Sequence, residues 1–152
     1  GFIMRPIVNS PEELSGTINT TKVTFLYFPF QPLHAIVKTP LAPLFHVADL
    51  AANKAYTIGR RGAWRDYVDL FILLKQKYAT LKQIITEAKR RFGDNFNPKL
   101  FLEQLTYFGD LNDFKVSWLV KPYSPTRIKK FLEQASADYL KHPWQSANFR
   151  LR

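Results

Sequence analysis

The stretch HVADLAANKAYTIGRRGAWRDYVDLFILLK, residues 46–75, decides the fold of this 152-residue chain. Its first apolar residues recur at the i, i+3, i+4 spacing of one helix face: Val47, Leu50 and Ala51. This pattern predicts a first helix beginning at His46, which we expect to cap or pack rather than to act as a base. A short basic loop at 59–62, flanked by glycines, is expected to end that helix. The apolar periodicity then resumes and predicts a second helix over about 63–76.

Capping and breaking residues predict three more helices downstream. The expected ranges are 81–91, 99–107 and 126–141. The signals are Thr80 as an N-cap, Gly93 as a stop, Pro98 in a first turn, Ser124-Pro125 at a start and Pro143 as a final stop. Residues 46–152 are therefore expected to form an α-helical domain. We expect Trp64, Trp118 and Trp144 to belong to its core rather than to a base-stacking surface.

Residues 1–45 have a different character and are expected to form a partial β region. Prolines recur throughout this stretch and disfavour helices. Residues 22–28, KVTFLYF, are rich in β-branched and aromatic side chains and predict a strand, with 34–38 as a second candidate. A stable sheet usually needs three or more strands. We therefore interpret the region as the end of a sheet, with Glu12-Glu13 in a solvated loop, and predict the α+β class.

The charge balance indicates an anionic partner. The chain has 22 Lys and Arg against 12 Asp and Glu, a net charge of +10. Such an excess suits a nucleotide, RNA, DNA or an acidic protein, although a basic surface that serves only solubility is the alternative. The absence of cysteine excludes disulfides and thiolate metal sites and fits a cytoplasmic location. No apolar run reaches the roughly 20 residues of a membrane span, so we expect no membrane partner.

A cluster of charged residues in the two central helices is the candidate site. Lys54 is expected near the end of the first helix. Asp66 and Asp69 lie three apart near the start of the second, so both carboxylates share one helix face. Arg61 and Arg65 crowd the intervening turn. Lysine and arginine bind phosphate oxygens and carboxylates bind Mg²⁺, so these residues could hold a triphosphate with a divalent cation.

The same residues have a structural interpretation. Asp66 and Asp69 near a helix N-terminus are favoured by the helix dipole alone. Arg65 could pair with a carboxylate on a neighbouring helix, which contributes little when exposed. From spacing alone, both interpretations stay open.

The stretch 46–75 resembles the downstream motif region of the AbiEii/AbiGii-type nucleotidyltransferases, the toxins of type IV toxin–antitoxin systems and their relatives. That family typically shows a short helix ending in a Lys, a basic turn with R-G, and R-D-x-x-D-L leading into an apolar helix. Four other pieces of the chain resemble the family pattern and occur in the family's order: KVTFLYFPF at 22–30, APLFHVADL at 42–50, LKQII at 81–85 and NPKLFLEQLTYFGD at 97–110. The resemblance covers roughly residues 20–120.

The resemblance implies a role for each candidate residue. Lys54 would contact nucleotide phosphates, and Arg61 and Arg65 would support phosphate binding or brace the turn. Asp66 would help to position or deprotonate the attacking group, whereas Asp69 would serve mainly to hold the helix. A complete homologue would use Mg²⁺ and a nucleoside triphosphate, and residues 1–45 would be the end of a nucleotidyltransferase-type sheet.

One part of the family pattern has no counterpart in this sequence. The family's fold begins with a Gly-Gly/Ser-Thr turn and a D-x-D strand that binds the metal ions, and Ser15-Gly16-Thr17 is followed by no D-x-D. We therefore expect a C-terminal portion of a nucleotidyltransferase-like protein that is inactive alone. The alternative is a non-catalytic basic module for nucleic acid or an acidic antitoxin partner. Strand edges left unpaired would also favour a homo-oligomer.

Overall fold

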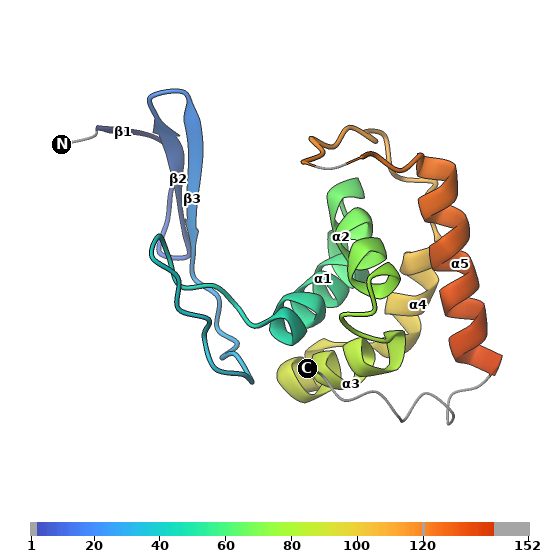
Figure 1. Cartoon of the computed structure of the whole chain (residues 1–152). Helices are drawn as coiled ribbons and strands as arrows, with labels where there is room; N and C mark the ends of the chain where they lie inside the picture. Colours follow the sequence, from blue (N-terminus) through green and yellow to red (C-terminus); the bar gives the residue numbers. More distant parts are fainter. Residues whose placement is uncertain (1–2, 120, 142–152) are drawn as a thin grey trace. The chain divides into compact units, whose positions relative to one another are not determined.

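The computed structural model describes residues 3–119 and 121–141, with the side chain of Arg61 left out. The chain divides into two compact units, Gly1–Gln31 and Pro32–Arg152. The described part of the first unit holds three strands and that of the second holds five α-helices, which confirms the α+β class (Figure 1). The elements are β1 (Met4–Asn9), β2 (Glu13–Ile18), β3 (Thr21–Leu26), α1 (Val47–Arg61), α2 (Trp64–Lys75), α3 (Leu81–Phe92), the 3-10 turn η1 (Gly93–Asn95), α4 (Pro98–Thr106) and α5 (Pro125–Lys141).

The first unit is an antiparallel sheet in the order β1-β2-β3. The strand expected at 22–28 is confirmed as β3, but β1 and β2 were not expected, and Glu13 begins β2 instead of lying in a loop. Pro6 is tolerated because β1 is an edge strand, where the ladder is interrupted between Pro6 and Val8. Gly16 lies at the centre of β2, where a Cβ atom would overlap the Arg5 carbonyl oxygen.

The second strand candidate, at 34–38, is wrong. Only Val37 pairs, through two backbone hydrogen bonds of 2.9 Å with Leu44. Pro40 and Pro43 lie between them, and proline has no N–H to extend the ladder. The segment is a loop closed by one bridge.

The loop over 32–45 belongs to the helical unit because Asp49 ties it to α1. Asp49 is 1% exposed, and its carboxylate accepts hydrogen bonds from the backbone N–H groups of Leu33, at 2.8 Å, and His34, at 3.0 Å. The buried Arg91 guanidinium of α3 donates to the same carboxylate at 3.1 Å and to the Asp49 carbonyl at 3.2 Å. One carboxylate therefore joins the loop, α1 and α3.

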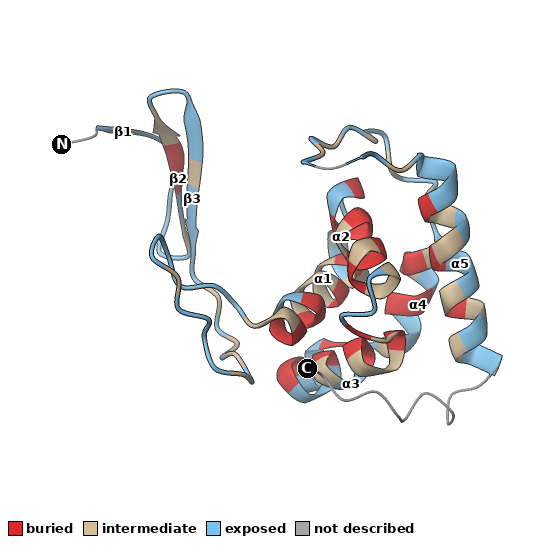
Figure 2. Cartoon of the chain, viewed as in Figure 1, coloured by how far each residue is buried: buried red, intermediate tan, exposed pale blue. Residues whose placement is uncertain are grey.

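Helix α1 is the centre of the helical unit and packs against α2, α3 and α4. Its buried residues are mostly small: Ala48, Ala51, Ala52 and Ala55, with Ile58 as the large apolar one. The prediction of a loop at 59–62 is wrong, because α1 continues through Arg61. Of these four residues only Gly62 lies outside the helix. Gly59 is tolerated inside the helix, where a Cβ would lie 4.0 Å from the Phe101 Cα of α4. Figure 2 shows the buried residues on the facing sides of these helices.

The other helices confirm the sequence signals to within a residue or two. Thr80 caps α3 through its side chain and Gly93 ends it with φ +55°. Pro98 lies in the first turn of α4. His46 caps α1, since its Nδ1 accepts from the Ala48 N–H at 3.2 Å. Trp64 is buried as expected and Trp118 is only half-buried, while Trp144 and Pro143 lie outside the described residues.

The buried pair of Asp49 and Arg91 predicts a large effect of removing one partner. Asp49→Ala removes the carboxylate that neutralises the buried Arg91 guanidinium and accepts from the two loop N–H groups, so we expect a loss of about 3–5 kcal/mol in the free energy of unfolding. Urea unfolding followed by far-ultraviolet circular dichroism measures this. As a matched control, Glu103→Ala removes the partner of an exposed ion pair with Lys99 and should cost less than about 1 kcal/mol. Equal losses for both variants would contradict the assignment.

Candidate functional site

The structure brings together three of the residues chosen from the sequence. Lys54 lies in the middle of α1, not near its end as expected, and faces the first turns of α2. Its Nζ atom lies 3.0 Å from Asp66 Oδ1 and 2.6 Å from Asp69 Oδ2. Because residues three apart on a helix share a face, both carboxylates of α2 reach the same ammonium group.

Asp66 is the buried member of this cluster and also holds the start of α2. It is 6% exposed. Its Oδ2 accepts from the Ala63 N–H at 3.1 Å, while the Asp66 N–H donates to the Ala63 carbonyl at 2.8 Å. This reciprocal pair satisfies two backbone groups at the helix end, as a capping residue does. Each of its carboxylate oxygens therefore has a partner.

Asp69 is the accessible carboxylate, with a side chain 48% exposed. The resemblance assigned it the task of holding the helix, but Asp66 makes the capping bond. Asp69 binds Lys54 through one oxygen, and its other oxygen has no hydrogen-bond partner among the described residues. An exposed carboxylate with a free oxygen can bind a cation or accept a proton.

The environment keeps Lys54 charged. Burial acts to lower its pKa, but the hydrogen bonds to Asp69 and Asp66 and their negative charges outweigh this, and the pKa is raised above 10.5. The ammonium group has three N–H donors. Two of them serve the carboxylates, so one remains for a further acceptor.

The two arginines chosen from the sequence differ in what the structure describes. Arg65 is exposed on α2, one turn before Asp69, and forms no ion pair with any residue in the described ranges. The side chain of Arg61 lies outside the described part of the structure. Arg60 points elsewhere, with its guanidinium 4.3 Å above the Tyr56 ring and 3.4 Å from the Asn95 carbonyl oxygen.

Tyr67 connects the cluster to the end of α4. It is 1% exposed, and its hydroxyl donates to the Gln104 carbonyl at 3.1 Å. Burial raises the pKa of Tyr67 to about 12, and the charges of Asp110 and Asp66 add to the effect. The phenol therefore stays neutral and cannot serve as a base near neutral pH.

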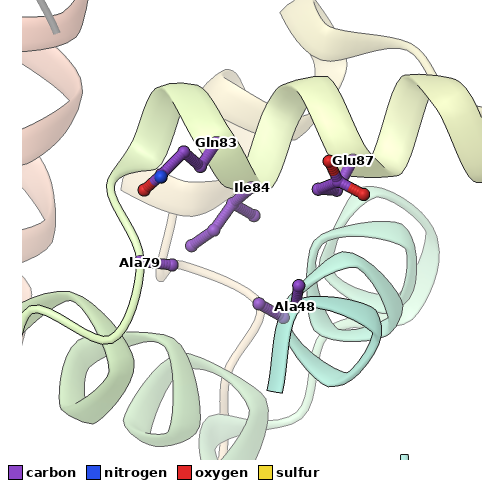
Figure 3. A pocket seen from close by; sticks show the side chains of 6 residues that line it. Ala48, Ala79, Gln83, Ile84 and Glu87 are labelled. Atoms are coloured by element: carbon purple, nitrogen blue, oxygen red, sulfur yellow. The ribbon is translucent and has the colours of Figure 1, made fainter. Parts of the chain in front are cut away.

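A small cavity lies apart from the cluster, between α1, α3 and the loop before α3 (Figure 3). It measures about 90 Å³ and is lined by Ala48, Ala51, Ala79, Gln83, Ile84 and Glu87. Glu87 is held there by His34 Nε2 at 3.1 Å and Arg90 at 2.8 Å, and the His34 ring stacks on His46 at 4.7 Å. Sequence periodicity gave no signal for this network, because His34 and Glu87 lie far apart in the chain. None of the predicted site residues lines the cavity.

Over 3–119 and 121–141, no group of three or more His, Cys, Asp or Glu side chains is arranged to hold a metal ion. Within the same residues, every helix is too short or too polar to cross a bilayer.

Comparison with known proteins gives a distant relative. Over 94 residues the chain is 27% identical to the uncharacterized protein aq_aa25 of Aquifex aeolicus, a match that covers 62% of this chain. The chain spans 44% of the length of that relative. No family model matches the sequence, and no solved structure matches the fold.

The unequal burial of the two carboxylates predicts unequal effects of neutralising them. Asp66→Asn removes a buried charge that serves both Lys54 and the start of α2, so we expect a loss of about 2 kcal/mol in unfolding free energy. Asp69→Asn leaves the Asp66 pair intact at a half-exposed position and should cost less than about 1 kcal/mol. Urea unfolding compares the two. A larger loss for Asp69→Asn would contradict the geometry.

The raised pKa of Tyr67 predicts a loss of stability in alkali. Above pH 10 the tyrosine ionises in the unfolded chain but stays protonated in the folded one. The folded state then binds more protons, so the unfolding free energy falls as pH rises from 10 to about 12. Tyr67→Phe should cost about 1 kcal/mol at pH 8 through the lost hydrogen bond and should flatten this decline. An unchanged decline would show that other groups cause it.

Proposed function

We propose that the helical unit is the nucleotide-phosphate-contacting part of a nucleotidyltransferase-like protein of the AbiEii/AbiGii type. In this proposal the chain is a C-terminal portion that contributes no metal-binding D-x-D carboxylates and is inactive alone. A complete homologue would use Mg²⁺ and a nucleoside triphosphate in the cytoplasm, as one half of a toxin–antitoxin system. The ordered motif resemblance over residues 20–120 motivates the proposal.

The observation that carries the proposal is the arrangement around Lys54. Its ammonium group is fixed by two carboxylates and retains one N–H donor. Arg65, one turn before Asp69, has no competing ion pair among the described residues. A fixed ammonium and a free guanidinium at the surface of two adjacent helices suit the oxygens of a polyphosphate.

The geometry also favours different roles for the Asp66 and Asp69 carboxylates. Asp66 has both oxygens engaged, so we assign it the role of positioning Lys54 and the start of α2. Asp69 has a free oxygen at the surface, so we assign it the contact with the magnesium ion of the nucleotide or with the attacking group. This reverses the emphasis that the family resemblance placed on the two residues.

Nucleotide binding by the chain itself tests the proposal. Isothermal titration with GTP, ATP, CTP and UTP in the presence of Mg²⁺ should detect saturable binding of at least one nucleotide. Lys54→Ala should weaken it about tenfold to a hundredfold, the effect of losing a charged hydrogen bond. Arg65→Ala should weaken it to a smaller degree.

Lys99→Ala is the matched control, because Lys99 is exposed on another helix and carries the same charge. It should leave the dissociation constant unchanged within about twofold. Circular dichroism establishes that each variant is folded. Failure of every nucleotide to bind, or an equal loss for Lys54→Ala and Lys99→Ala, sinks the proposal.

A further inference from the structure

Positive charge gathers where the segment after α4 meets the start of α5. From residue 111 to residue 132 the sequence has five basic residues against one acidic residue, Asp113. The basic residues are Lys115, Lys121, Arg127, Lys129 and Lys130. The rest of α5, from residue 133 to 141, has two acidic residues and one basic residue. The excess is therefore confined to one end of the helix.

Two of these cations, and a third from α2, lie over aromatic rings. The Nζ of Lys75, at the end of α2, is 5.5 Å from the centre of the Tyr123 ring, and the Arg127 guanidinium is 5.2 Å from the same centre. The Nζ of Lys129 lies 4.4 Å from the centre of the Phe114 ring. A cation over a ring keeps its full charge while its side chain is ordered. Cations from two helices thus converge on one tyrosine.

These cations lack neutralising carboxylates. Over 3–119 and 121–141, no acidic side chain forms an ion pair with Lys75, Arg127 or the lysines of α5's first half. The basic residues at the end of α3 differ, since Lys89 pairs with Asp94 at 3.3 Å and Arg90 pairs with Glu87 at 2.8 Å. Unneutralised charge next to ordered rings is available to an anionic partner.

The charges also work against the local helix. Cations near a helix N-terminus oppose the macrodipole, and α5 has no acidic residue in its first turn. By contrast α1 and α2 have Asp49 and Asp66 in that position. Helix stability therefore does not account for Arg127, the cation in the first turn of α5, which points to a use outside the fold.

Trp118 adds a stacking ring beside the cations. Its ring centre is 5.9 Å from that of Tyr123, and the side chain is only half-buried. Tyr123 itself packs edge-on against the core residue Phe71, with the ring centres 5.0 Å apart. The core thus fixes Tyr123, and Tyr123 fixes both the cations and the tryptophan.

We propose that this basic-aromatic surface, made of Lys75, Trp118, Tyr123, Arg127, Lys129 and Lys130, binds single-stranded nucleic acid. The cations contact phosphates and Trp118 stacks on an unpaired base. A duplex offers its phosphates but not the faces of its bases, so an exposed ring beside the cations suits an unpaired strand. The surface lies on the opposite face of α2 from Lys54, because Phe71 and Lys75 face the α5 side whereas Asp66 and Asp69 face α1.

Fluorescence anisotropy with a labelled single-stranded RNA or DNA of about 16 nucleotides tests the proposal. The affinity should fall steeply from about 50 to about 300 mM salt. The double variant Arg127→Ala/Lys130→Ala should bind at least tenfold more weakly and lower the salt slope by about 0.7 for each lost phosphate contact. Trp118→Ala should weaken binding about fivefold or more, and Trp118→Phe should restore most of it.

The matched control is Lys89→Ala/Arg90→Ala, which removes the same charge from cations that are already ion-paired. It should retain affinity within about threefold. The proposal is overturned if the wild-type chain does not bind, if the control loses as much as Arg127→Ala/Lys130→Ala, or if Trp118→Ala has no effect. Equal binding of polyglutamate also overturns it, in favour of an acidic protein partner.

Discussion

A half-buried ammonium group must be neutralised, and Lys54 meets this constraint with two carboxylates from a single turn of α2. The same contact ties α1 to α2, because Asp66 binds both Lys54 and the backbone N–H of Ala63, the N-cap residue of its own helix. On another face of α1, Asp49 joins α3 and the preceding loop. Helix α1 is therefore fixed by an ion pair on each side of an alanine-rich stripe that lets its neighbours approach closely.

Much of the helical unit could be predicted from local signals. Thr80, Gly93 and Pro98 act within one helical turn of their own position, so their effect can be inferred without knowing what packs nearby. The shared face of Asp66 and Asp69 likewise follows from helical geometry alone. The sequence also assigned Lys54 to the same site, but near the end of the first helix, whereas the structure has it in the middle of α1.

The sequence predictions that the structure contradicts lie where contacts between distant residues override the local preference for a helix, strand or loop. Gly59 signalled a loop, but α1 continues through it to Arg61 and packs against α4. Residues 34–38 have the composition of a strand but form only one β-bridge, between Val37 and Leu44, because prolines interrupt the returning segment. Arg91 stood in a basic cluster with Lys89 and Arg90, yet it alone turns inward to Asp49. No local pattern distinguishes a buried partner 42 residues away.

In the proposed site, Lys54 contacts a nucleotide while the carboxylates of Asp66 and Asp69 keep its ammonium group charged. Nuclear magnetic resonance of the lysine ε-methylene groups observes this side chain directly, with Lys54→Ala providing the assignment. The Lys54 signal should titrate above pH 10.5 in the free chain and shift saturably on addition of a nucleoside triphosphate with Mg²⁺, while the Lys99 signal stays in place. A Lys54 signal that does not respond to any nucleotide, or that responds no more than Lys99, would contradict the account.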